Sequence, residues 1–126
     1  MLKDSPAFSG FAVNDLDAAK AFYGGKLGLD ARPGPMGSLE LHLASGATVF
    51  IYSKKDHVPA TYTMLNFPVP DVEAAVDQLA KVGIKMERYP NMGQDAKGIL
   101  RGNGPDIAWF KDPSGNVLSV LKVDAL

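Results

Sequence analysis

The second half of the chain repeats the first, and this repeat constrains the fold more than any other feature. The segment VNDLDAA, residues 13–19, recurs as VPDVEAA, residues 69–75, and Ser45-Gly46 recurs as Ser114-Gly115. The two aspartates are 56 residues apart (71 − 15), and the Ser-Gly pairs are 69 apart (114 − 45). We therefore expect two copies of one unit, with about thirteen extra residues in the second copy between its helix and its last hairpin.

Hydrophobic periodicity and turn residues predict the order β-α-β-β-β in each copy. In the first copy, Asp15 is expected to cap the helix and Gly28 to end it; the strands are expected at residues 7–13, 30–36, 39–43 and 48–53. In the second copy, Asp71 and Gly83 have the same roles, and the strands are expected at residues 62–69, 84–89, 106–111 and 117–123. The segment DPSGN, residues 112–116, is typical of a hairpin turn.

This order predicts an α+β protein with one domain over residues 1–126. Unit 1 would cover about residues 7–53, a connector residues 54–61, and unit 2 about residues 62–123. The polar, Gly-rich segment 91–105 is expected to form a long loop, which is either functional or a tolerated surface excursion.

Composition excludes several classes of function. With 126 residues and 46% hydrophobic content, the chain can bury a core, within one chain or across a dimer. A net charge of −1 gives no field to attract nucleic acid or an anionic membrane. There is no cysteine, so disulfides, thiolate nucleophiles and thiolate metal sites are excluded. Without an apolar leader or a run of about 18 apolar residues, the expectation is a cytoplasmic protein.

Three motifs occur in order along this duplicated unit: D-[LV]-[DE]-A-A after each first strand, AFY-x3-LGL in the first helix, and DPSGN before the last strand. Together they resemble the vicinal oxygen chelate superfamily, which includes glyoxalase I, extradiol dioxygenases, fosfomycin-modifying thiol transferases and bleomycin-resistance proteins. The resemblance covers residues from about Phe8 to Val123. It implies a curved, mostly antiparallel sheet trough with helices on its outer face.

The resemblance also implies where a metal would be bound. Metal-binding members use one ligand from the first strand and one from the last strand of each unit. These positions correspond here to Phe8, Phe50, Met64 and Ser119. Phenylalanine cannot coordinate, a thioether suits soft metals, and a lone hydroxyl binds weakly. We therefore expect no metal and no cofactor, as in the metal-free bleomycin-resistance members.

The two histidines give no complete alternative site. Alternation around a tight Ser45-Gly46 turn predicts Glu40 and His42 on the face opposite Phe50. The pair could supply two metal ligands, but a third is not apparent, so His42 is expected to be a surface or hydrogen-bonded side chain. His57 lies in the connector and is expected to be exposed to solvent. No catalytic residue is predicted.

Aromatic and thioether side chains are expected to line the trough in place of ligands. Strand alternation pairs Trp109 with Ser119 and Ile107 with Leu121. Such a lining suits a flat, largely apolar molecule held by stacking, with polar groups fixing its orientation; Lys97 is a further candidate for that orienting role. The ligand-binding residues predicted are Phe8, Phe50, Tyr52, Tyr62, Met64, Asn66, Arg101, Trp109 and Ser119.

Two functional classes remain open. One is a non-catalytic protein that sequesters a small aromatic, amphipathic or glycopeptide-like compound and so confers antibiotic resistance. The alternative is a glyoxalase- or dioxygenase-type enzyme with an atypical metal site, or a metal-free lyase or isomerase. A structural or regulatory role without a small ligand is a third reading. A homodimer is expected because short curved sheets leave apolar surface that pairing can bury; neither nucleic acid nor a membrane is expected as a partner.

Overall fold

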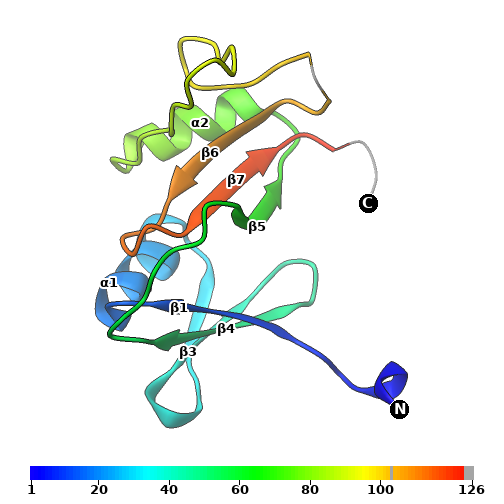
Figure 1. Ribbon diagram of the computed structural model, residues 1–126, viewed down its shortest axis with the longest axis vertical. Helices are drawn as coiled ribbons and strands as arrows, with labels where there is room; N and C mark the ends of the chain where they lie inside the picture. The colour runs from blue at the N-terminus through cyan, green and yellow to red at the C-terminus, as the bar shows by residue number, and fades with distance from the viewer. Residues whose placement is uncertain (103, 124–126) are drawn as a thin grey trace. The chain divides into compact units, whose positions relative to one another are not determined.

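The computed structural model describes residues 1–102 and 104–123, and the chain divides into two compact units. Unit 1 runs from Met1 to Val58, and unit 2 begins at Pro59 (Figure 1). Each unit has its own mixed sheet and its own helix, so the α+β class predicted from the sequence is confirmed. None of the described helices is long and apolar enough to span a membrane.

Unit 1 has the predicted β-α-β-β-β order. Its four-stranded sheet has the order β1-β4-β3-β2, in which β1 runs parallel to β4 and the other neighbours are antiparallel. The strands are β1 (Ser9–Val13), β2 (Asp30–Pro33), β3 (Leu39–His42) and β4 (Thr48–Ser53). Two short 3-10 turns lie at Leu2–Asp4 and Pro35–Gly37.

The helix of unit 1 begins as predicted but widens halfway. Asp15 caps α1 (Leu16–Lys20) by accepting a hydrogen bond from the Ala18 amide at 3.1 Å. The chain then continues as a π-helical turn, Ala21–Lys26, which contains Gly24-Gly25. Phe22 and Tyr23 in this turn are buried, and their rings meet edge to face at 5.1 Å. The helix contacts β4, so one face of the sheet is covered and the other is not.

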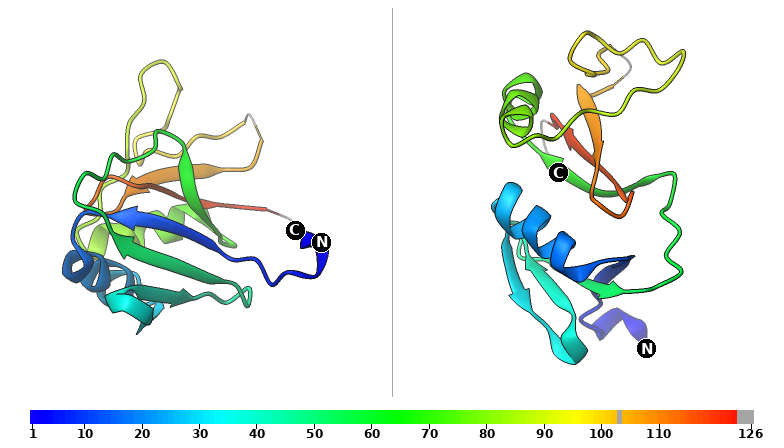
Figure 2. Two further views of the ribbon diagram at one scale, coloured as in Figure 1. Left: turned by 60° about the horizontal axis from the view of Figure 1, so that its bottom comes forward. Right: turned by 90° about the vertical axis from the view of Figure 1, so that its left-hand side faces the viewer.

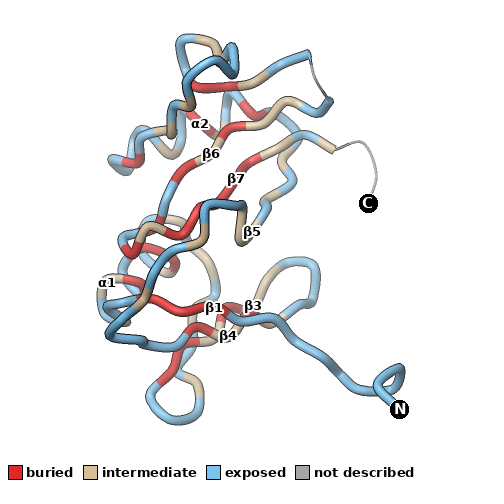
Figure 3. Tube along the Cα trace, viewed as in Figure 1, coloured by how far each residue is buried: buried red, intermediate tan, exposed pale blue. Residues whose placement is uncertain are grey.

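Alternation along the strands separates these two faces. Side chains on the helix-covered face are buried and form the core of unit 1 (Figure 3). The strand residues among them are Phe11, Val13, Leu39, Leu41, Val49 and Ile51. The intervening residues point to the opposite face, which carries the candidate site described below.

Unit 2 has three strands in the order β5-β7-β6. They are β5 (Thr63–Pro68), β6 (Ile107–Lys111) and β7 (Val117–Leu121); β7 is parallel to β5 and antiparallel to β6. Asp71 caps α2 (Val72–Lys81) through the Ala74 amide at 3.1 Å, with the same cap geometry as Asp15. Figure 2 shows α2 along one face of this sheet, where it contacts β6 and β7.

The strand predicted at residues 84–89 is wrong. This segment runs beside β6 but forms only one backbone bond to it, from the Glu87 amide to the Trp109 carbonyl at 2.7 Å. The Gln94 side chain bonds to other backbone groups of the segment: it accepts a hydrogen bond from the Tyr89 amide at 2.8 Å and donates one to the Glu87 carbonyl at 2.9 Å. A side chain from the long loop thus replaces a strand ladder.

The two hairpins that close the units have the same geometry. In unit 1 the Leu43 amide donates to the Ala47 carbonyl, and in unit 2 the Asp112 amide donates to the Asn116 carbonyl. Gly46 and Gly115 stand at the left-handed position of these three-residue loops, with φ of 92° and 87°. The spacing of 69 residues found in the sequence is therefore kept in three dimensions.

The DPSGN loop differs from its counterpart by a buried carboxylate. Asp112 accepts hydrogen bonds of 2.9 Å from the amides of Ser114 and Asn116 and from the Asn116 side chain. We expect Asp112→Ala to lower the free energy of unfolding by about 1–3 kcal/mol, since buried donors would lose their acceptor. Urea unfolding provides the measurement.

The matched control is Ser45→Ala in the equivalent loop, where an exposed hydroxyl accepts a longer, 3.3 Å bond from the Ala47 amide. This control should change stability by less than about 0.5 kcal/mol. Equal effects of the two substitutions would show that the Asp112 network does not hold the turn.

Candidate functional site

The uncovered face of the unit 1 sheet carries Glu40, His42 and Phe50 together. Cross-strand pairing sets Glu40 opposite Phe50 and His42 opposite Thr48. The prediction that Glu40 and His42 lie on the face opposite Phe50 is therefore wrong. A two-residue turn would have paired Leu41 with Phe50, but the observed three-residue loop shifts the register by one and exchanges the faces.

Aromatic side chains extend along the same face. The Phe8 and Phe50 rings meet edge to face at 6.3 Å, and the Phe50 and Tyr52 rings stack at 5.8 Å. Phe8 is 72% exposed and Tyr52 is 41% exposed, which is unusual for aromatic groups in a small protein. Three of the predicted ligand-binding residues are thus brought into one row.

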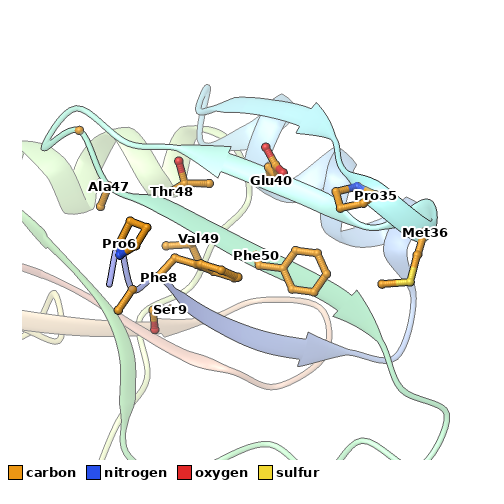
Figure 4. A pocket seen from close by; sticks show the side chains of 12 residues that line it. Pro6, Phe8, Ser9, Pro35, Met36, Glu40, Ala47, Thr48, Val49 and Phe50 are labelled. Atoms are coloured by element: carbon orange, nitrogen blue, oxygen red, sulfur yellow. The ribbon is translucent and has the colours of Figure 1, made fainter. Parts of the chain in front are cut away.

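A cavity of about 860 Å³ is lined by Phe8 and Phe50 of this row. In Figure 4, Glu40 lies on β3 and Phe50 on the adjacent β4, with Met36 near one end and Phe8 on the segment leading into β1. Apolar and small residues dominate the lining, which consists of Pro6, Ala7, Phe8, Ser9, Pro35, Met36, Glu40, Gly46, Ala47, Thr48, Val49 and Phe50. A hollow of this size is typical of small-molecule sites.

Charged groups form a second row beside the aromatic one. Glu40 Oε1 lies 3.1 Å from His42 Nε2, and both side chains are about one-third exposed (31% and 32%). On the edge strand, Arg32 makes two hydrogen bonds, of 3.0 and 2.7 Å, to Asp30. The hydrogen bond from Arg32 lowers the pKa of Asp30. The contact with Glu40 makes His42 a hydrogen-bonded side chain, as expected.

The equivalent face of unit 2 centres on Trp109 and Ser119, which pair as predicted. The indole Nε1–H of Trp109 donates to Thr63 Oγ1 at 3.1 Å, and its ring meets the Tyr89 ring edge to face at 5.7 Å. Ser119 is fully buried, and its hydroxyl donates to Asn66 Oδ1 at 2.6 Å. The polar groups on this face are thus bonded to one another.

A bulge at the start of β5 changes which residue faces Trp109. Thr63 pairs with Val117 and Leu65 with Leu118, so Met64 is an extra residue in the strand. Thr63 shares the face of Trp109, and the half-buried Met64 stands at the irregularity. Tyr62 lies just before the strand and is 70% exposed.

The structure does not bring Arg101 or Lys97 to the face of Trp109. Lys97 Nζ lies 2.9 Å from an Asp77 oxygen on α2. Arg101 contacts Asp95 at 3.2 Å, Asp106 at 3.0 Å and Glu73 on α2 at 3.7 Å. Since α2 covers the side of the sheet opposite Trp109, both cations lie away from the Trp109 face. Their ion pairs with α2 anchor the long loop instead.

Further contacts tie this loop to itself. Asp95 Oδ1 accepts from the amides of Lys97 and Ile99, both at 2.9 Å. The hydrogen bond from the Ile99 amide is the chief cause of the lowered pKa of the Asp95 carboxyl. The stability that this carboxylate contributes is therefore lost as pH falls through the lowered pKa. Arg88 donates to the carbonyls of Asp95 and Ala96, and Ile99 is fully buried. Residues 91–102 therefore form a structured excursion.

His57 departs from its predicted exposure. Its amide donates to the Lys54 carbonyl at 3.1 Å, and this turn folds the connector back so that the ring is half-buried. Its Nε2 is buried and has no hydrogen-bond partner among residues 1–102 and 104–123.

The residues at the family's metal-ligand positions do not fit a metal. Phe8 and Phe50 have no donor atom. The Ser119 hydroxyl is committed to Asn66, and the bulge replaces Met64 by Thr63, whose hydroxyl accepts from Trp109. Within the described chain, no three His, Asp or Glu side chains are close enough to share one ion.

Sequence reasoning missed Tyr89, Thr63 and Met36 as members of these surfaces. Tyr89 lies in the segment predicted as a strand, which the structure does not form. No motif in the sequence marks the β5 bulge that turns Thr63 toward Trp109. The correct face of Glu40 could have been found, because the 69-residue spacing makes Glu40 equivalent to Trp109, whose pairing was predicted correctly.

Solved structures with the same fold come from several bacteria. A glyoxalase family protein from Enterococcus faecalis is 22% identical, with 97% of this chain and 100% of that chain covered and a TM-score of 0.67. A hypothetical protein from S. aureus is 18% identical, with 94% of each chain covered and a TM-score of 0.70. The fosfomycin resistance protein FosX from Listeria monocytogenes is 14% identical, with 95% and 93% covered and a TM-score of 0.69.

No protein of curated function matches the sequence. The family model described as "Glyoxalase/Bleomycin resistance protein/Dioxygenase superfamily" matches residues 7–120, which is most of the chain. Together with the duplicated unit and the paired hairpins, this match shows that the chain belongs to the glyoxalase/bleomycin resistance protein/dioxygenase superfamily.

Proposed function

We propose that this protein binds and sequesters a small aromatic or glycopeptide-like compound without using a metal or cofactor. The observation that carries the proposal is the row of Phe8, Phe50 and Tyr52 beside a cavity of about 860 Å³. Exposed aromatic faces in such a hollow favour stacking with a flat ligand. Trp109 and Tyr89 present a second pair of rings in unit 2.

Antibiotic resistance is the biological role that this proposal implies. The family includes bleomycin resistance proteins by its description, and FosX, which shares the fold, is a fosfomycin resistance protein. Both support a compound-binding role, and the aromatic lining favours a larger, flatter compound. We also propose a cytoplasmic location, where such a compound would be intercepted.

A second candidate function is a metal-free lyase or isomerase. The observation that favours it is the hydrogen bond between Glu40 and His42 on the same face as Phe50. A carboxylate that orients an imidazole is an arrangement suited to general base catalysis. Turnover of an α-hydroxycarbonyl or hemithioacetal that is abolished by His42→Ala would favour this candidate over sequestration.

We expect the second pair of rings, Trp109 and Tyr89 in unit 2, to bind a flat aromatic compound as well, and Trp109→Ala to weaken binding at those rings at least several-fold. The reason is the loss of roughly 0.5–1.5 kcal/mol of ring interaction beyond the lost area, and about 1.4 kcal/mol is a factor of ten. Isothermal titration with aromatic antibiotics, flavins and glycopeptides is the measurement. In the wild-type protein the same ligands should quench or shift the fluorescence of the single tryptophan.

Trp109→Phe is the matched control, because it keeps an aromatic ring but removes the bond to Thr63. It should retain most of the affinity. Unchanged binding by a correctly folded Trp109→Ala protein, checked by circular dichroism, would rule out the unit 2 rings as a ligand site and leave the unit 1 cavity.

We expect less than about 0.1 transition-metal ion per chain in protein purified without an affinity tag, since aromatic and hydroxyl groups occupy the family's ligand positions. Elemental analysis checks the content, and EDTA should leave the urea midpoint unchanged. One tightly bound ion per chain would contradict the proposal, and Glu40 and His42 would then be the first residues to replace.

We expect a homodimer in which a second copy covers the exposed aromatic face and completes the ligand site. Light scattering at about 10 μM should give twice the mass of one chain, because exposed apolar surface favours association. A monomer with full ligand affinity would be inconsistent with a site shared between copies.

A further inference from the structure

The lining of the cavity in unit 1 is largely apolar and carries one ionisable group. Glu40 is the one ionisable side chain among the described residues that line it. It stands directly opposite Phe50 across the β3–β4 pair, so a molecule stacked on Phe50 lies beside the carboxylate. A single charge in an apolar hollow selects the charge of the ligand, because an uncompensated partner would be costly to desolvate.

The neighbours of Glu40 leave its charge available. His42 donates from Nε2 to Oε1 at 3.1 Å, since a carboxylate only accepts, and this bond fixes the side chain. No described residue donates a hydrogen bond to Oε2, which lies close to Gly34. With its side chain 31% exposed, Glu40 is within reach of a ligand.

The cation across the strand pair, Arg32, makes its hydrogen bonds to a different carboxylate. Arg32 lies opposite Glu40 on β2, but its Nε and Nη2 groups donate to Asp30 at 3.0 and 2.7 Å. Asp30 and Arg32 cancel each other, so Arg32 is committed to a carboxylate other than Glu40. Phe8 and Phe50 add the electron-rich faces that attract a cation.

We propose that the unit 1 cavity binds planar aromatic cations, and that Glu40 determines this charge specificity. The proposal rests on the proposed ligand-binding function and narrows it to one class of ligand. The positive charge of the ligand would lie against Glu40 Oε2, and its ring would stack on Phe50.

Three tricyclic probes of similar area test the charge preference: 10-methylacridinium, acridine, which is neutral at pH 8, and anthracene-9-carboxylate. Dissociation constants would be measured by isothermal titration at pH 8. We expect the wild-type protein to bind the cation about fivefold more tightly than acridine, as a partly exposed ion pair allows, and the anion more weakly than both. Added salt should weaken binding of the cation alone.

Glu40→Gln keeps the shape of the side chain and removes its charge. In this variant the affinity for 10-methylacridinium should fall to that for acridine, while acridine binding stays unchanged. Glu73→Gln, the same change on α2, controls for net charge and should keep the cation preference. Phe50→Ala should weaken binding of the cation and of acridine.

Each outcome separates the two proposals. Equal affinities of the wild-type protein for all three probes, or a cation preference that survives in Glu40→Gln, would overturn the role of Glu40 and leave the binding function standing. No binding of any probe by the wild-type protein would overturn both. If Glu40→Gln does not fold, the salt dependence of wild-type binding decides the question alone.

Discussion

The left-handed glycine in each closing hairpin is the constraint on which the surfaces of both units depend. Gly46 and Gly115 allow a three-residue loop, and this loop fixes the register of the strands that follow. Because side chains alternate with period two, one residue more or less in the loop would exchange the buried and uncovered faces. The positions of Glu40 and Trp109 on their faces follow from this one backbone conformation.

The equivalence of the hairpins also explains how one scaffold carries two different surfaces. Glu40 and Phe50 in unit 1 stand where Trp109 and Ser119 stand in unit 2. The first pair leaves a carboxylate and a ring beside a hollow, whereas the second is bonded to Thr63 and Asn66. The two units thus share equivalent backbone positions, and the side chains at those positions give each unit a different surface.

Most of the fold could be predicted from the sequence because its signals are local. Aspartate caps, glycine stops and the DPSGN turn act within a few residues, and they located both helices and every observed strand, with one strand predicted in excess. The face of Glu40 was missed because a two-residue turn was assumed where three residues form the loop. Segment 84–89 was predicted as a strand and is not one, because the Gln94 side chain bonds to its backbone, a contact that no periodicity reveals. The bulge at Met64 likewise depends on how β5 pairs with β7.

The tethered loop of unit 2 has a consequence for behaviour at high concentration. An open strand at the side of a sheet can recruit a strand from another molecule and start aggregation. Along β6 this opportunity is removed, since Leu100 exchanges backbone bonds with Ile107 and Glu87 donates to Trp109. In unit 1, the outer strand β2 is only four residues long, ends in Pro33 and carries the charged pair of Asp30 and Arg32. Strands β2 and β6 are thus protected from pairing with strands of other molecules in two different ways.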